Sequence, residues 1–134
     1  MVKGGRVTSI YVKRPWLKNY PEGVPHNIEL RNETAIGDYV ASAHQKPDAP
    51  AVHYFDESIS YGDIDSFSNS FAAALNDLGV AKGDRVILVL QNINQFLIGI
   101  YAALKIGEIV VPLNPIYKEK ELSYLFKDSD SKIL

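Results

Sequence analysis

Residues 83–113 read GDRVILVLQNINQFLIGIYAALKIGEIVVPL, and this stretch decides the fold. A turn at Gly83 leads into the near-continuous apolar run 85–90, which is typical of a strand buried on both faces of a sheet. Apolar residues then recur at helical spacing over 92–107, and 109–111 is a second apolar strand. A strand, a helix and a strand in this order predict a parallel βαβ unit.

Two residues mark the ends of the predicted helix, and further elements follow the second strand. We expect Asn92 to cap the helix and Gly107 to end it. Residues 112–115 (PLNP) predict a turn, 122–126 a further helix, and 132–134 the start of a third strand. A central parallel strand needs its full length and neighbours, so we expect the chain to be cut there. The fold class predicted is α/β, a partial parallel-sheet βαβ subdomain.

Upstream of this unit, the spacing of residues predicts two helices and a hairpin. Thr34 can cap a short helix that ends at Pro47, and 51–55 with 59–60 form two short strands. Ser60 and Asp63 are a capping pair for the next helix, and Gly79 follows it as a C-cap. Its apolar stripe is predicted to be core: Ile64, Phe67, Phe71, Leu75 and Leu78.

Residues 1–33 have no sustained periodicity and contain Pro15, Pro21 and Pro25. Prolines at this spacing favour extended structure. Trp16 and Tyr20 lie between them, and aromatic residues are uncommon in disordered tails. We therefore predict an extended arm over 1–33 that docks on a surface, followed by one truncated domain over 34–134.

Composition limits the classes of function. The net charge is −2, so the chain lacks the basic face that nucleic-acid binding needs. The arm is mildly basic, and we read it as solvated, with peripheral contact to an anionic membrane as the alternative. There is no cysteine and no secretory signal, so we expect a cytoplasmic protein without disulfides. The sequon at 32–34 is interpreted as a helix cap.

No constellation of residues in the sequence makes a catalytic site. Neither GxxxxGK[ST] nor GxGxxG is present, and the Gly4-Gly5 pair is isolated. The remaining candidates are three histidines, three serines on the polar flank of a helix, and two aspartates that superficially resemble a calcium loop without its glycine and glutamate. They are His26, His44, His53, Ser66, Ser68, Ser70, Asp128 and Asp130. We predict no catalytic, cofactor-binding or metal-binding residue.

The order of motifs from residue 34 to 134 closely resembles the amino-terminal region of the adenylate-forming acyl-CoA synthetases. The residues that carry the resemblance are 60–64 (SYGDI), Asn69, 72–75, 78–80 (LGV), 82–86 (KGDRV), 91–92, 95–96, 102–107, 111–115 (VPLNP) and 121–122. Residues 14–25 (RPWLKNYPEGVP) resemble the leader of the long-chain fatty acyl-CoA ligase branch. The resemblance implies that this chain is the first part of the large AMP-binding domain.

For the parent enzyme, the resemblance implies a two-step reaction that uses ATP, Mg²⁺ and coenzyme A. A fatty acid carboxylate attacks the α-phosphate of ATP, and the coenzyme A thiol then displaces AMP from the acyl-adenylate. In the family, the phosphate loop, the adenine and ribose motifs and the catalytic lysine follow the matched region. The resemblance therefore implies that this chain alone is inactive and that its partner is the remainder of the parent chain.

The matched residues are carried over as a fold signature and not as catalysts. They are Tyr61, Gly83, Asp84, Asn92, Pro112, Asn114, Pro115 and Glu121. Gln91 departs from the family, which commonly has proline before the asparagine. Surface meant to face later parts of the parent is expected to be uncovered, which predicts self-association.

Three alternatives stay open beside this hypothesis. The chain could be a stand-alone interaction module that pairs through a sheet edge or its aromatic arm. It could come from another AMP-forming ligase, specific for aryl or medium-chain acids. A small flavodoxin-like nucleotide binder is a third alternative, which the missing phosphate loop disfavours.

Overall fold

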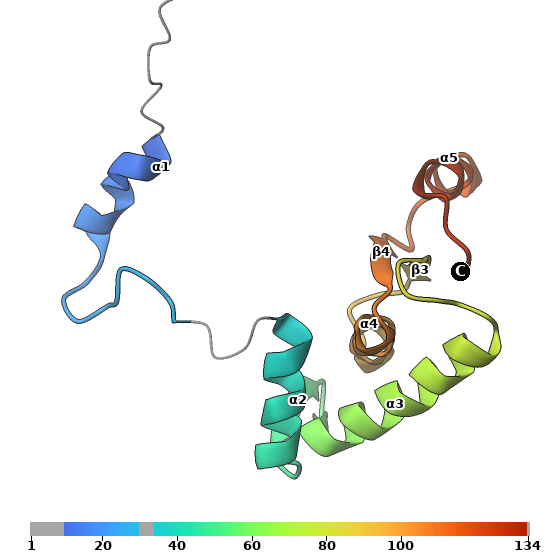
Figure 1. Ribbon diagram of the computed structural model, residues 1–134, viewed down its shortest axis with the longest axis horizontal. Coiled ribbons are helices and arrows are strands. Elements are labelled where there is room, and N and C mark those ends of the chain that lie inside the picture. Colours follow the sequence, from blue (N-terminus) through green and yellow to red (C-terminus); the bar gives the residue numbers. More distant parts are fainter. Residues whose placement is uncertain (1–9, 30–33, 134) are drawn as a thin grey trace, which may run out of the picture. The chain divides into compact units, whose positions relative to one another are not determined.

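The computed structural model describes residues 10–29 and 34–133. The chain divides into two compact units, Met1–Arg31 and Asn32–Leu134, and each is described by itself. The glycine pair at 4–5, the first two residues of the sequon at 32–34, and Leu134 lie outside the described residues. Figure 1 shows the elements of both units.

The described part of the first unit contains helical turns over residues 10–19, so the prediction of extended structure is wrong there. A short helix α1 (Ile10–Lys13) is followed by the 3-10 helix η1 (Pro15–Asn19). Pro15 opens η1, a position where the missing N–H costs nothing. Arg14 precedes the proline with a φ of 45°, outside the right-handed region that proline disfavours for its neighbour. Its guanidinium donates to Asn27 Oδ1 at 2.7 Å and to the His26 carbonyl.

The second unit opens as predicted, with a capped helix and a hairpin. Helix α2 (Ala35–Gln45) starts at Thr34, whose hydroxyl oxygen accepts from the Gly37 N–H at 3.1 Å. Strands β1 (Pro50–Tyr54) and β2 (Glu57–Ser60) pair antiparallel. Local capping and turn residues therefore position this part of the chain.

Helix α3 (Tyr61–Asp77) has both predicted end signals. Ser60 Oγ accepts from the Asp63 N–H at 3.1 Å, and the Asp63 carboxylate reaches back to the Ser60 N–H at 3.4 Å. At the other end Gly79 has a φ of 80°, and the N–H of Val80 bonds the Leu75 carbonyl. This left-handed termination turns the chain toward the parallel strands.

The predicted βαβ unit is confirmed. Strand β3 (Arg85–Val89), helix α4 (Asn94–Ile106) and strand β4 (Ile109–Leu113) follow in order. The strands pair in parallel with Arg85 opposite Ile109. Helix α5 (Glu119–Ser129) lies across the strands from α4 (Figure 1). At the end of the described chain, Ile133 makes a parallel bridge with Val86, which confirms the start of a further strand.

Two local predictions in this unit are wrong. Ile93 and not Asn92 is the N-cap of α4, and no side chain caps that helix. Pro112 and Leu113 belong to β4, for which β3 is the paired strand among the described residues. A proline has no N–H to donate, and an edge strand tolerates this loss. The turn begins only at Asn114, whose Oδ1 accepts from the Ile116 N–H at 3.1 Å.

The prediction that the apolar stripe of α3 is core is confirmed for Ile64 and Leu75, each 1% exposed, and wrong for its other residues, Phe67, Phe71 and Leu78. Phe67 is 51% exposed and Leu78 is 68% exposed, whereas Ser68 is fully buried. The buried face of α3 consists of Ile64, Ser68, Ala72 and Leu75. Small side chains allow α3 to approach Ala102 and Ala103 of α4, both of which are fully buried. The prediction that Ser68 lies on the polar flank is wrong for the same reason.

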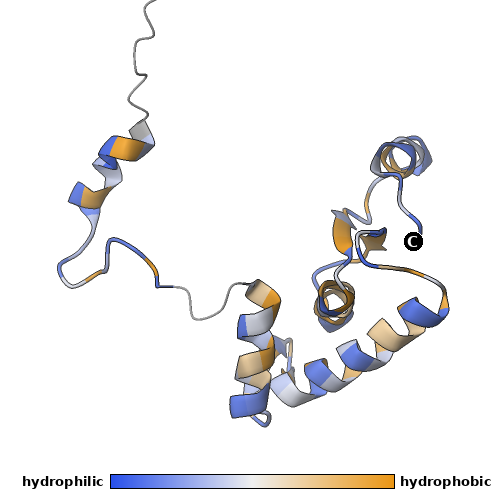
Figure 2. Cartoon of the chain, viewed as in Figure 1, coloured by the Kyte–Doolittle hydropathy of each residue, from blue (hydrophilic) through white to orange (hydrophobic). Residues whose placement is uncertain are grey.

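Two hydrophobic clusters hold this unit together. One joins α3, α4 and the parallel strands through Leu75, Val86, Leu88 and Ala102. Figure 2 shows the strands as hydrophobic and α5 as largely hydrophilic. The other cluster joins α2, α3 and the hairpin, and Tyr39 lies in it.

Tyr39 shows how a polar aromatic residue is accommodated in the second cluster. Its ring stacks on Tyr101 with centroids 3.8 Å apart, and its hydroxyl donates to the Tyr61 carbonyl at 3.0 Å. A partnered hydroxyl removes most of the cost of burying a tyrosine. Among the described residues, no helix combines the length and the apolar character needed to cross a membrane.

Candidate functional site

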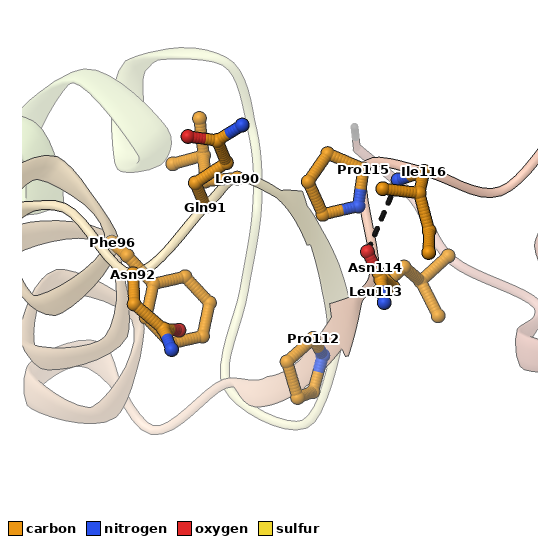
Figure 3. A pocket seen from close by; sticks show the side chains of 9 residues that line it. All are labelled: Leu90, Gln91, Asn92, Phe96, Pro112, Leu113, Asn114, Pro115 and Ile116. Atoms are coloured by element: carbon orange, nitrogen blue, oxygen red, sulfur yellow. Dashed lines mark hydrogen bonds between the residues drawn. The ribbon is translucent and has the colours of Figure 1, made fainter.

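A hollow of about 400 Å³ lies where β3 and β4 end. The carboxyl ends of parallel strands share one edge of a sheet, which is where open α/β proteins bind their ligands. Both strand ends contribute to the hollow, together with Phe96 of α4 (Figure 3). The lining residues are Leu90, Gln91, Asn92, Phe96, Pro112, Leu113, Asn114, Pro115 and Ile116.

The β4 side of the hollow is held by the backbone turn after the strand. Asn114 turns its side chain back onto the Ile116 N–H (Figure 3), and its carbonyl accepts from the Tyr117 N–H at 3.1 Å. Pro112 and Pro115 on either side restrict the backbone further. The wall is therefore shaped by local sequence and not by distant contacts.

The chemistry of the hollow is apolar and uncharged. Its polar side chains are the carboxamides of Gln91, Asn92 and Asn114, and no lining residue is titratable. Carboxamides can donate and accept hydrogen bonds but cannot transfer protons at neutral pH. The described lining residues therefore suit a neutral or apolar group, to which they offer the hydrogen bonds of three carboxamides.

The structure gathers half of the fold-signature residues at this hollow. Asn92, Pro112, Asn114 and Pro115 line it. The others lie elsewhere: Tyr61 starts α3, and Glu121 accepts from the Lys118 N–H at 2.9 Å at the start of α5. Gly83 and Asp84 belong to the turn before β3, where Asp84 accepts from the Ala81 N–H at 2.8 Å.

Sequence reasoning missed a polar cluster between α3 and α4. Lys105 Nζ donates to Asp65 Oδ1, Ser68 Oγ and Asn69 Oδ1, each at 2.7 Å, and lies 3.1 Å from the Asp65 carbonyl. Asn69 Nδ2 also donates to the other Asp65 carboxylate oxygen at 3.2 Å. Such mutual satisfaction indicates a structural joint between the helices. In the sequence, the one signal of this cluster is that Lys105 occupies a position on the apolar side of its predicted helix, and this signal is weak.

The three histidines lie in different segments of the two units. His44 is in the last turn of α2. The His26 ring lies edge-on to the Tyr20 ring, with ring centroids 6.1 Å apart. His53 Nδ1 lies 2.7 Å from Ser58 Oγ. Within 10–29 and 34–133, no group of three or more His, Cys, Asp or Glu could hold a metal ion. Asp130, in the left-handed region with a φ of 49°, ends α5.

Curated relatives match most of this chain. It is 36% identical over 122 residues to a long-chain-fatty-acid–CoA ligase of Bacillus subtilis (strain 168), covering 91% of this chain and 22% of that protein. It is also 36% identical over 120 residues to the Yersinia pestis ligase of the same description, covering 88% and 21%. The chain thus spans about a fifth of the length of these relatives.

Solved structures share the fold of the second unit. VinN in complex with 3-methylaspartate superposes with a TM-score of 0.72 at 31% identity, over 78% of this chain and 30% of that chain. The N-terminal subdomain of Klebsiella oxytoca NpsA superposes with a TM-score of 0.69 over 75% and 26%, and at 21% identity it supports the fold alone.

A family model supports the same assignment. The model described as AMP-binding enzyme matches residues 39–134, which include α3, the βαβ unit and the hollow at its carboxyl edge. Sequence motifs, backbone topology and relatives agree on one group of proteins. The chain belongs to the AMP-binding, adenylate-forming enzyme family.

Proposed function

We propose that this chain is the amino-terminal part of an AMP-forming ligase that joins long-chain fatty acids to coenzyme A. The observation that carries the proposal is the 36% identity to long-chain-fatty-acid–CoA ligases over 91% of the chain. The match includes the first unit, where residues 14–25 resemble the leader of that branch. The parent enzyme would use ATP, Mg²⁺ and coenzyme A.

In this proposal the chain supplies scaffold and not reacting groups. The parent activates the carboxylate as an acyl-adenylate with release of pyrophosphate, and the coenzyme A thiol then displaces AMP. Stabilising a triphosphate needs cations and positive side chains. The hollow lined by Asn92 and Asn114 has no charged residue, so a triphosphate would have to be held by other parts of the parent.

ATP–pyrophosphate exchange tests this proposal directly. We expect no exchange from residues 1–134 with any carboxylate, and exchange that depends on long-chain fatty acid from a parent chain expressed from the continued reading frame. Benzoate and a medium-chain acid serve as comparison substrates for the aryl and medium-chain alternatives. Exchange catalysed by the 134-residue chain itself would overturn the scaffold role, and preference of the parent for benzoate would overturn the fatty-acid assignment.

A stand-alone interaction module is the second candidate function. The exposed apolar side chains of α3 favour it, because Phe67 is 51% and Phe71 is 39% exposed. A stop codon directly after codon 134 would support the module, and a reading frame that continues would support the ligase. The flavodoxin-like alternative has its own test: a nucleotide binder should show a higher melting temperature when ATP is added.

We also propose that the 134-residue chain self-associates through this face of α3. Phe71 and residues 87–90, at and just after the end of β3, line a second hollow of about 260 Å³, beside an edge of β3 that is paired only near Val86 in the described chain. An open strand edge next to apolar side chains is a ready surface for a second copy. Sedimentation velocity should show dimers or larger species, which Phe67→Ser with Phe71→Ser should reduce.

The matched control is Phe55→Ser, which removes an aromatic side chain that is 88% exposed on the hairpin turn. Self-association that persists in the double variant, or monomer at every concentration of the wild type, would contradict this proposal. For the parent we propose a cytoplasmic location with the arm in solvent. Binding of residues 1–31 to vesicles rich in anionic lipid would instead support a peripheral membrane contact.

A further inference from the structure

Glu108 carries a carboxyl group that the fold buries without a partner. Its residue is 4% exposed, and neither carboxyl oxygen has a hydrogen-bond partner among the described residues. It follows the left-handed Gly107 at the end of α4 and directly precedes β4. An ionised carboxylate without partners is expensive to bury, so this position needs a physical explanation.

Backbone hydrogen bonds connect the residues around Glu108 to neighbouring elements. Its own N–H donates to the Ala103 carbonyl at 3.0 Å, and Ile109 N–H donates to the Asp84 carbonyl at 2.9 Å. The Gly83 N–H donates to the Gly107 carbonyl at 3.0 Å. These bonds tie the end of α4, where Glu108 lies, to the turn before β3.

The charged groups on the neighbouring elements do not neutralise Glu108. Lys132 Nζ donates to Asp84 Oδ2 at 2.9 Å and to the Gly79 carbonyl at 2.6 Å, and Lys105 is bound to Asp65. The side chain of Lys82 packs along Gly107, and Arg85 stands opposite Ile109 in the strand register. The remaining neighbour is Asp84, which has the same sign of charge as an ionised Glu108.

The two carboxyl groups therefore respond to the fold in opposite directions. Burial, and then the charge of Asp84, raise the pKa of Glu108 above its usual value. The hydrogen bond from Lys132 and then the Ala81 N–H lower the pKa of Asp84. One proton on Glu108 and none on Asp84 is the arrangement that this geometry stabilises.

We propose that Glu108 and Asp84 form a pH-sensitive latch between the end of α4 and the turn before β3. The latch is closed while Glu108 is protonated and Asp84 is bound to Lys132. Ionisation of Glu108 places a second negative charge near Asp84, on a carboxyl group that is itself buried and has no hydrogen-bond partner among the described residues. The α4–β4 junction then loosens from residues 79–84.

The direction of the pH dependence follows from linkage. An acid whose pKa is raised by folding leaves stability unaffected below its unfolded pKa. As the pH rises above that value, the unfolded chain ionises first, and stability falls until the folded pKa is reached. Glu108 therefore destabilises the protein at neutral pH relative to mildly acidic pH. Asp84 acts oppositely and loses its stabilising effect as the pH falls through its lowered pKa.

Thermal melts of the 134-residue chain from pH 4.5 to 8.5 test the latch. Glu108→Gln keeps the shape of the protonated side chain but cannot ionise, so its Tm should match the wild type near pH 4.5. At pH 8 its Tm should be higher than that of the wild type by several degrees, because the variant has no carboxylate that must be buried in ionised form. Glu108→Met should also have a higher Tm than the wild type at pH 8, and it introduces no amide group that would have to be buried.

Glu57→Gln is the control, because Glu57 is an exposed carboxylate on β2. It should leave the difference between pH 4.5 and pH 8 unchanged. The Glu108 carboxyl ¹³C resonance gives a second readout and should titrate above the range of an exposed glutamate. Parallel Tm–pH curves for the wild type and both Glu108 variants, or a Glu108 resonance that titrates as in a free peptide, would overturn the proposal.

Discussion

Replacing Lys105 by alanine is expected to lower the free energy of unfolding of the second unit by about 3 kcal/mol. The ammonium lies between α3 and α4, with side-chain exposures of 12% for Lys105 and 19% for Asp65. Its removal leaves the Asp65 carboxylate with one donor, Asn69, and leaves the buried Ser68 hydroxyl next to an empty space. Most of the cost is the desolvation of acceptors that have lost their donor.

Urea denaturation followed by circular dichroism measures this loss. Lys105→Met retains the apolar part of the side chain, so it separates the loss of the charge from the loss of packing, and we expect it to recover less than half of the effect. Lys127→Ala is the matched control, because Lys127 is an exposed lysine in the last turn of α5. A surface substitution of this kind usually changes stability by less than about 0.5 kcal/mol. Equal losses for Lys105→Ala and Lys127→Ala would refute the structural joint.

Leu75→Ala is the second substitution with a large expected effect. Leu75 is 1% exposed in the cluster that joins α3, α4 and the parallel strands. Truncating a buried leucine removes its transfer free energy and leaves a cavity, so we expect a loss of about 3 kcal/mol. The midpoint of urea denaturation should fall while the slope of the transition stays unchanged.

Leu78→Ala provides the comparison on the same helix end. Leu78 belongs to the same apolar stripe in the sequence but is 68% exposed, so its loss should change stability by less than about 0.5 kcal/mol. A cost for Leu78→Ala equal to that for Leu75→Ala would show that the stripe predicted from the sequence is buried after all. In a self-associated sample the comparison should be made at low protein concentration, because Leu78 is on the exposed side of α3.

Local signals carried most of the prediction of the fold. Thr34, Ser60 with Asp63, Gly79 and Gly107 mark helix ends in the sequence and do so in the structure. A cap acts over three or four residues, so its effect does not depend on the rest of the chain. Asn92 is not the cap, because α4 starts at Asn94 and its N-cap position is therefore Ile93. The spacing of apolar residues does not fix a helix start to one residue.

The candidate site was only partly visible in the sequence. The sequence places Asn92 and Asn114 after successive parallel strands, and the structure shows that both line the hollow. Their positions follow from the parallel direction of the two strands, which the order strand, helix, strand predicts. Whether the space between them stays open depends on the packing of Phe96 and of the prolines, and this is a property of the assembled unit.

The sequence by itself determined the order of the elements, the parallel βαβ unit and most of the helix ends, because these depend on residues a few positions apart. Only the tertiary structure decided which face of α3 is buried, that Lys105 meets Asp65 across 40 residues, and that Glu108 is enclosed. The physical reason is close approach between elements. Small residues such as Ser68 and Ala72 pack α3 against α4, and this packing sets the surroundings of every side chain between them.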